Sequence, residues 1–108
     1  MSETLAKVRE HVKAGRVRVS QHAITELLDD GISLEAVVSG IEAALIVEDY
    51  PGHARGPCVL CFQRIEADKP VHVLWGIATH SPGIATLITA YRPDPERWMD
   101  DLMTRRPR

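Results

Sequence analysis

Two side chains suited to anion recognition, Tyr91 and Arg92, stand side by side near the C-terminal end of the chain. Alternating apolar residues indicate a strand that ends at Tyr91, and Pro93 cannot donate a hydrogen bond to a sheet. Asp94 and Pro95 are typical of the N-cap and first position of a helix. A phenol and a guanidinium at such a strand-to-helix junction suit the recognition of a phosphate or another anion.

Counting residues across the predicted hairpins places a histidine and an arginine beside Tyr91. Three apolar segments read as strands, and the short polar turns between them are typical of antiparallel hairpins. If residues 80–83 close the second hairpin, His72 faces Tyr91, and if residues 67–69 close the first, Arg64 faces His72. Opposed side chains in a sheet lie ~5 Å apart at Cβ. The sequence therefore predicts a polar row across three strands, which a one-residue slip would break.

This row carries the functional groups that RNA cleavage without a metal requires. The reaction needs a base for the 2′-hydroxyl, an acid for the leaving oxygen and a cation for the charge on phosphorus. His72 and Tyr91 would supply base and acid, in an order that the sequence leaves open, and Arg64 or Arg92 would bind the phosphate. The alternative interpretation is an ordinary polar edge of a half-exposed sheet.

His22 is a further candidate for acid–base chemistry. Ser20 is a typical N-cap, and the apolar stripe of the helix that follows, to about Asp30, points away from His22. Glu26 stands one turn further on, where its carboxylate would hold an imidazolium. The simpler interpretation is a solvent-facing histidine in a first helical turn, and the pattern alone favours it.

No metal, cofactor or small-molecule ligand is expected from the residue pattern. Cys58 and Cys61 fall in a predicted strand, where they lie on opposite faces and ~10 Å apart at Cα. This spacing suits neither a disulfide nor a zinc pair, so we interpret both as small buried residues of a reduced protein. A weaker alternative is a metal site made of His22, His53 and Cys58. The chain has no Walker loop and no GxSxG motif.

The composition is that of one ordinary globular domain. The chain has 108 residues, of which 44% are hydrophobic and 26% are charged, and its net charge is −2. This balance excludes a protein that coats nucleic acid by bulk positive charge. No apolar stretch is long enough to cross a membrane, and the N-terminus lacks the apolar segment of a secretory signal. We therefore expect a cytoplasmic protein.

The pattern of elements predicts a single α+β domain over residues 1–108. Helical spacing and capping residues indicate helices over 3–14, over 20–30, from 33 onwards and over 95–104. Strand-like segments lie at 17–19, 45–47, 58–65, 71–79 and 84–91. These elements predict a small antiparallel sheet of four to five strands with helices on both faces, because the strands carry apolar residues on both sides.

Five short motifs occur in a characteristic order along the chain. They are Ser-Gln-His-Ala at 20–23, Asp-Gly-Ile-Ser at 30–33, Ile-Val-Glu-Asp-Tyr-Pro at 46–51, Pro-Val-His-Val at 70–73 and Ile-Thr-Ala-Tyr-Arg-Pro at 88–93. Over about residues 16–98 the chain resembles a family of small bacterial proteins catalogued as domain of unknown function 4258. The resemblance implies a RelE/ParE and BrnT-like toxin fold.

The same resemblance implies a function. It points to the toxin of a bacterial toxin–antitoxin pair, a metal-independent endoribonuclease that acts on RNA and binds an antitoxin protein. By match of motif, the positions carried over are His22, His72, Tyr91 and Arg92.

Two positions depart from that family pattern. Glu26 and Asp30 stand where the family usually has arginines, so two cations of a phosphate-binding region are missing. These departures motivate an alternative function, a non-catalytic protein-binding module of the same fold.

Overall fold

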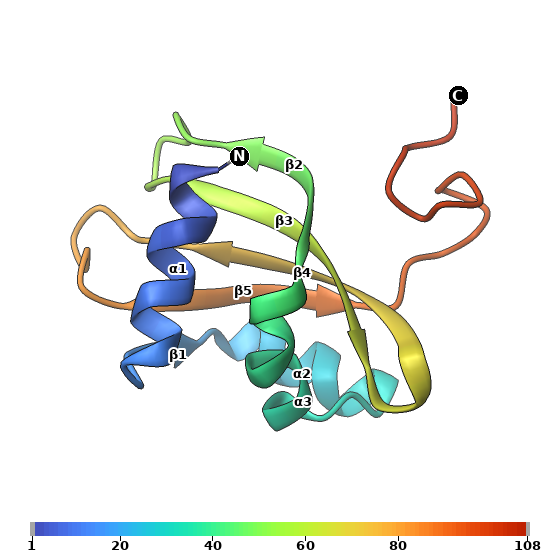
Figure 1. Cartoon of the computed structure of the whole chain (residues 1–108), viewed down its shortest axis with the longest axis horizontal. Helices are drawn as coiled ribbons and strands as arrows, with labels where there is room; N and C mark the ends of the chain where they lie inside the picture. Colours follow the sequence, from blue (N-terminus) through green and yellow to red (C-terminus); the bar gives the residue numbers. More distant parts are fainter. Residues whose placement is uncertain (1, 108) are drawn as a thin grey trace.

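Within residues 2–107, which the computed structural model describes, five strands form one mixed sheet and three helices pack against it (Figure 1). The strands are β1 (Val17–Val19), β2 (Leu45–Tyr50), β3 (Cys58–Ile65), β4 (Lys69–Gly76) and β5 (Ala85–Tyr91). The helices are α1 (Glu3–Lys13), α2 (Gln21–Asp30) and α3 (Leu34–Ser39), with short 3₁₀ turns at Gly40–Ala43 and Glu66–Asp68. None of these helices is long and apolar enough to cross a membrane.

Each helix begins at a serine that caps it. The side chains of Ser2, Ser20 and Ser33 accept hydrogen bonds from backbone N–H groups of the first turns of α1, α2 and α3. Gly31 ends α2 in the left-handed conformation, with φ of 62°. The helices predicted over 3–14, over 20–30 and from Ser33 onwards are confirmed, and α1 and α2 are each one residue shorter than predicted.

The sheet is mixed, which corrects the prediction of a purely antiparallel one. Its strand order is β1-β5-β4-β3-β2, and β1 runs parallel to β5 while every other pair is antiparallel. Three hairpin-like contacts follow the chain order, but β1 pairs with a strand almost 70 residues later, from Val17 opposite Ala85 to Val19 opposite Leu87. No turn signal in the sequence fixes the direction of so distant a partner.

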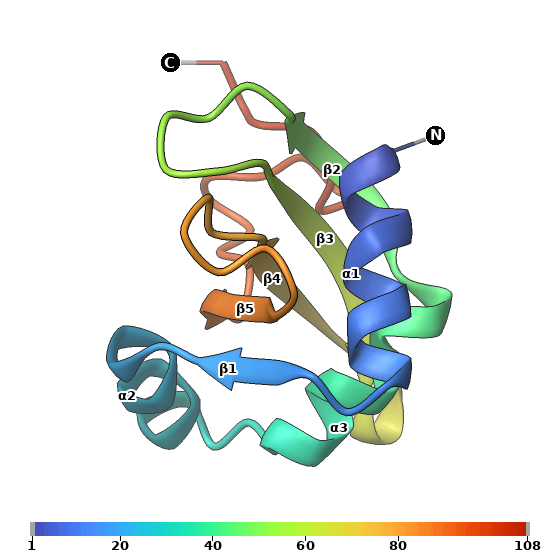
Figure 2. The same cartoon turned by 90° about the vertical axis from the view of Figure 1, so that its left-hand side faces the viewer.

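Residues from all three helices are buried in one core on one face of the sheet. Both views place α2 and α3 near the β1 end of the sheet, while α1 lies across the strands (Figures 1 and 2). The helical and turn residues of this core are Leu5, Val8, Ala23, Leu27, Val37 and Ile41, and the sheet residues include Val59, Cys61, Val71, Val73, Trp75, Ala85, Leu87 and Ala90. The prediction of helices on both faces is therefore wrong.

The C-terminal helix predicted over 95–104 is not formed. This stretch belongs to a segment, residues 93–107, that folds back as an irregular loop closed by an antiparallel bridge between Trp98 and Arg105. Leu102 has a φ of 58°, which no α-helix contains, and the Asp101 side chain accepts from two later N–H groups. Trp98 is buried against the sheet face opposite the core, and that contact outweighs the helical pattern.

Candidate functional site

His72 and Tyr91 face each other across β4 and β5, as the sequence predicted. The prediction of this pair was right only because two departures from the predicted β4–β5 register cancel. At the hairpin end Gly76 pairs with Thr86, one residue away from the expected register, and a bulge at Ile88 then restores it. The His72 Nδ1 atom lies 3.3 Å from the Tyr91 hydroxyl, so the two side chains form a hydrogen-bonded pair.

The prediction that Arg64 faces His72 across β3 and β4 is wrong. Phe62 faces His72 instead, and Arg64 faces Pro70. The connecting turn, Glu66–Asp68, holds two non-glycine residues at positive φ and lies one residue earlier than the predicted turn over 67–69, which shifts the pairing partners by two residues. A two-residue shift keeps the same face, but the Arg64 guanidinium now donates to a carbonyl of this turn and lies 5.1 Å from the Phe62 ring centroid.

We call the three side chains aligned across β3, β4 and β5 the ring row; they are Phe62, His72 and Tyr91. At its centre, His72 has no exposed surface, and both of its ring nitrogens are engaged. Nε2 donates to the Leu102 carbonyl, so Nδ1 is the acceptor for the Tyr91 hydroxyl. Burial lowers the pKa of His72, against the opposing effect of the Leu102 carbonyl, and burial raises the pKa of Tyr91. The pair is thus neutral imidazole and neutral phenol.

The segment 93–107 covers the ring row. The Trp98 ring meets the His72 ring edge to face, with 4.5 Å between centroids, and the Arg105 guanidinium lies 4.8 Å from the Trp98 centroid. Arg105 also donates two hydrogen bonds of 2.9 Å to the Glu48 carboxylate of β2. These bonds lower the pKa of Glu48. The segment is therefore fastened both to the rings and to an edge strand.

A hollow of about 260 Å³ opens beside Tyr91. Its lining residues are Tyr91, Arg92, Asp94, Arg97, Trp98 and Arg105, which include three arginines and one aspartate, and Arg105 is also paired with Glu48. Arg92 also donates to the Asp30 carbonyl at the end of α2. The sequence singled out Tyr91 and Arg92 but not Arg97 and Arg105, whose signal was only the concentration of arginine near the C-terminus. We call this the arginine hollow.

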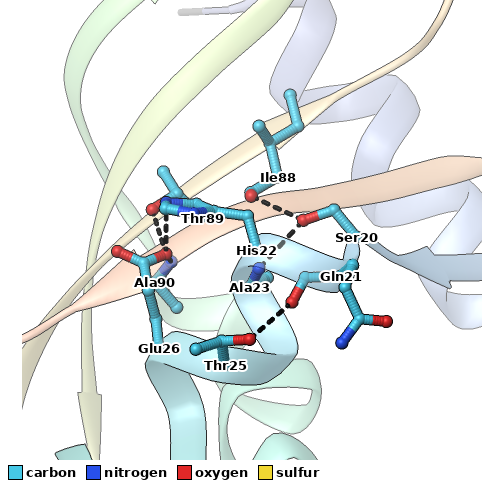
Figure 3. Close-up of polar contacts among 9 residues, drawn as sticks. All are labelled: Ser20, Gln21, His22, Ala23, Thr25, Glu26, Ile88, Thr89 and Ala90. Carbon is cyan, nitrogen blue, oxygen red and sulfur yellow. Dashed lines mark hydrogen bonds and ion pairs between the residues drawn. The ribbon is translucent and has the colours of Figure 1, made fainter. Parts of the chain in front are cut away.

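His22 lies apart from the ring row, beside the edge of β5 (Figure 3). Its side chain is exposed, and Nε2 lies 3.3 Å from Glu26 Oε1. The same carboxylate oxygen accepts hydrogen bonds from the Thr89 hydroxyl and the Ala90 backbone N–H. His22 is thus paired with Glu26, and within the described chain no hydrogen bond or ion pair joins its side chain to His72 or Tyr91.

Figure 3 also shows Ser20 and Glu26 forming hydrogen bonds with β5. β1 ends at Val19, so the rest of β5 has no neighbouring strand on that side. The Ser20 backbone N–H donates to the Leu87 carbonyl and its hydroxyl donates to the Ile88 carbonyl at 2.7 Å, while Glu26 accepts from the next free N–H. Ser20 and Glu26 therefore continue the hydrogen bonding that β1 begins, so Glu26 has a structural role.

The two cysteines are free, buried thiols on opposite faces of β3, as predicted. Burial raises the pKa of both thiols, that of Cys61 to about 12. Among the residues that the structure describes, no group of three or more histidine, cysteine, aspartate or glutamate side chains is arranged to hold a metal ion.

The sequence profile of one family, described as Domain of unknown function (DUF4258), matches residues 19–92. The chain belongs to this family. Searches of curated proteins and of solved structures found no match. The DUF4258 region contains the ring row, His22 and Glu26, whereas the segment 93–107 that covers the rings lies beyond it. The arginine hollow is therefore built jointly by the DUF4258 region and by the segment that follows.

Proposed function

We propose that this DUF4258 protein acts on RNA as the toxin of a bacterial toxin–antitoxin pair related to the RelE/ParE and BrnT-like toxins. One observation carries the proposal: Tyr91, backed by the buried His72, borders a hollow lined by three arginines. Guanidiniums bind phosphate oxygens in a forked geometry, and a phenol at their centre would meet the sugar hydroxyl beside the bound phosphate. The arginine hollow is then the phosphate site.

The geometry supports cleavage by the neighbouring 2′-hydroxyl. The 2′-oxygen attacks phosphorus, and the bond from phosphorus to the 5′-oxygen breaks, which leaves a 2′,3′-cyclic phosphate and a 5′-hydroxyl. Tyr91 takes the 2′-proton while its own proton passes to Nδ1 of His72, and the leaving oxygen takes a proton from water. Arg92, Arg97 and Arg105 stabilise the charge on phosphorus. Because His72 is buried, it positions Tyr91 and does not touch RNA.

The test is incubation of the purified full chain with total RNA and with a short single-stranded oligonucleotide. Tyr91→Phe should lower the cleavage rate by about 100-fold, the range for loss of one acid–base group. Arg97→Gln should weaken RNA binding. His22→Gln is the matched control, since His22 does not line the hollow and its imidazole is paired with Glu26. Cleavage that survives Tyr91→Phe but not His22→Gln would show that the active site lies at His22, beside the edge of β5.

A second candidate is a non-catalytic module that binds a partner protein. Specific observations favour it: Leu28 is 77% exposed and Ile24 is 39% exposed on α2, and Leu34 at the start of α3 is 41% exposed. Together with the carboxylates of Glu26 and Asp30, they replace an expected cationic surface by an apolar and acidic one. A chain that is harmless when expressed, and that loses its small copurifying partner on Leu28→Ser but not on Leu45→Ser, would support this function over cleavage.

A further inference from the structure

The other end of the ring-row face holds a larger hollow, of about 570 Å³. Its floor contains three small residues that are neighbours across β3, β4 and β5, which we call the small-residue row: Cys58, Gly76 and Thr86. A Cβ at Gly76 would lie 2.7 Å from Ile88 Cδ1, the end of a movable side chain, and 3.3 Å from Cys58 Cβ, so the glycine keeps this part of the floor open. A cysteine, a glycine and a threonine in register leave open the space that aromatic rings fill at the opposite end. The volume is in the range of small-molecule sites.

The walls of this hollow are fixed in place without a ligand. They come from the loops that follow β2 and β4, and two backbone hydrogen bonds join these loops: Ile77 N–H to the Pro57 carbonyl at 3.0 Å and Thr79 N–H to the Arg55 carbonyl at 3.1 Å. Gly56 permits this approach, since it has a φ of 124° and any Cβ there would collide with the Ile77 carbonyl. A preformed site loses little entropy when a ligand binds.

The polar groups around the hollow suit a ligand with one negative charge. Arg55 and His80 are exposed lining residues, and no aspartate or glutamate of the described chain lines the hollow. Thr86, on the floor, has a buried hydroxyl oxygen with no hydrogen-bond partner among residues 2–107. A buried hydroxyl without a partner is unfavourable for folding.

We propose that this hollow binds a small molecule with an apolar body and one carboxylate. The body would lie over Gly76 and Ile88, and the carboxylate would lie at the rim with Arg55. Sequence reasoning predicted no small-molecule ligand, because Gly76 lies opposite Thr86 only through the register shift at Ile88, which the sequence does not indicate. The proposal does not rest on RNA cleavage, which uses the opposite end of the face.

Octanoate is a suitable probe, with octan-1-ol and octylamine as chain-matched controls. Titrated into the ¹⁵N-labelled full chain, octanoate should shift the amide signals of Gly76, Thr86 and Ile88 in a saturable way. A guanidinium at the rim should favour octanoate over octylamine by roughly fivefold or more. Shifts that do not saturate, that cluster on other elements, or that are matched by octylamine at equal affinity overturn the proposal.

Two further measurements test separately the contribution of the Arg55 charge and the position of the ligand in the hollow. Arg55→Gln should weaken octanoate binding by about fivefold and leave octan-1-ol binding unchanged, whereas Lys69→Gln at the distant hairpin turn should change neither. In the unmodified chain, saturating octanoate should slow the alkylation of Cys58, which lines the hollow, by iodoacetamide. Cys61, on the core face, should stay unreactive and report that the fold is intact. Equal loss of both ligands in Arg55→Gln, or unchanged Cys58 alkylation, contradicts the assignment.

Discussion

The two ends of one sheet face differ in what fills them. At one end the ring row projects large side chains, and the chain's own Trp98 closes over them. At the other end the small-residue row leaves a hollow that no segment of the described chain fills. The same three strands form both ends, so side-chain size rather than backbone topology decides where the protein completes its own packing and where it leaves room for a ligand.

The comparison also separates stability from binding. The covered end buries Trp98 and His72 and is fastened by Arg105 to β2, so changes there should lower the free energy of unfolding. The open end leaves the Thr86 hydroxyl without a partner, so changes there should alter binding more than folding. The following predictions test this division, from the largest expected effect to the smallest.

Replacing the indole that closes the ring row should have the largest effect. Trp98 is 3% exposed, so Trp98→Ala should lower the free energy of unfolding by about 3 kcal/mol or more, measured by urea denaturation. Met99→Ala is the matched control, because its side chain is 40% exposed, and it should cost well under about 1 kcal/mol. Similar losses in the two variants would show that the covering segment does not pack stably on the rings.

Glu26 supports β5, which runs through both ends of the face. Glu26→Ala leaves the Ala90 N–H and the Thr89 hydroxyl without their acceptor, so it should cost about 2 kcal/mol in urea denaturation. Glu26→Gln keeps an acceptor oxygen and should cost less than half of that amount. Glu10→Ala, at an exposed acidic position of α1, is the control. If Glu26→Ala behaves like Glu10→Ala, the side-chain bonds do not replace the missing part of β1.

The buried imidazole of the ring row should make stability depend on pH. Because burial lowers the pKa of His72 in the folded chain, the unfolded chain binds a proton more readily as the pH falls below about 6.5. The free energy of unfolding should therefore decrease from there until the pH reaches the lower pKa of the folded chain. Urea midpoints between pH 8 and pH 5 measure this decrease.

Two variants assign this pH dependence. His72→Gln should remove the decrease below pH 6.5. A separate loss should occur below pH 4.5, because the bonds from Arg105 lower the pKa of Glu48, and protonation of that carboxylate weakens them. Glu48→Gln should remove this second loss. A His72→Gln chain with the original profile above pH 5 would assign the first decrease to another group.

The clasp between Arg105 and Glu48 should contribute less. Its two side chains are 61% and 29% exposed, so a double-mutant cycle with Arg105→Gln and Glu48→Gln should give a coupling of about 0.5–1 kcal/mol, which falls in high salt. Arg106, paired at 3.5 Å with the fully exposed Asp100, is the comparison pair and should show less coupling. Equal coupling energies in the two pairs would mean that the Arg105–Glu48 pair does not specifically stabilise the packing of residues 93–107 on the ring row.

The smallest effect belongs to the open end. Thr86→Val removes a buried hydroxyl that has no partner, at nearly constant volume, and should raise the free energy of unfolding by about 0.5 kcal/mol. Ser20→Ala is the contrasting variant, because the Ser20 hydroxyl caps α2 and bonds to β5, and it should destabilise by about 1 kcal/mol. A destabilised Thr86→Val chain would show that the hydroxyl already has a partner.

Local signals account for most of what could be predicted of the fold. Ser20 and Ser33 mark helix starts, Gly31 marks a helix end, and β3 begins and ends at the predicted residues because its apolar run is bounded by turn residues. The predicted helix over 95–104 failed for a non-local reason: burying Trp98 on His72 requires a fold-back that a helix cannot make.

The candidate site was predicted less completely. The pairing of His72 with Tyr91 was correct, although it depends on a bulge at Ile88 that no local pattern indicates. Arg64 was placed opposite the wrong residue, because a turn with two non-glycine residues at positive φ is not visible in the sequence. Arg97 and Arg105 reach Tyr91 only through the fold-back of the C-terminal segment, so the prediction missed them.

The sequence by itself determined where most helices and strands begin and which family the chain belongs to, because capping, periodicity and short motifs involve near neighbours. The tertiary structure decided the parallel pairing of β1, the cover over the ring row and the row of small residues at the open end. Those features depend on contacts between separate elements or on the register shift at Ile88, and their free energy comes from burial and hydrogen bonding that exist only after the sheet has formed.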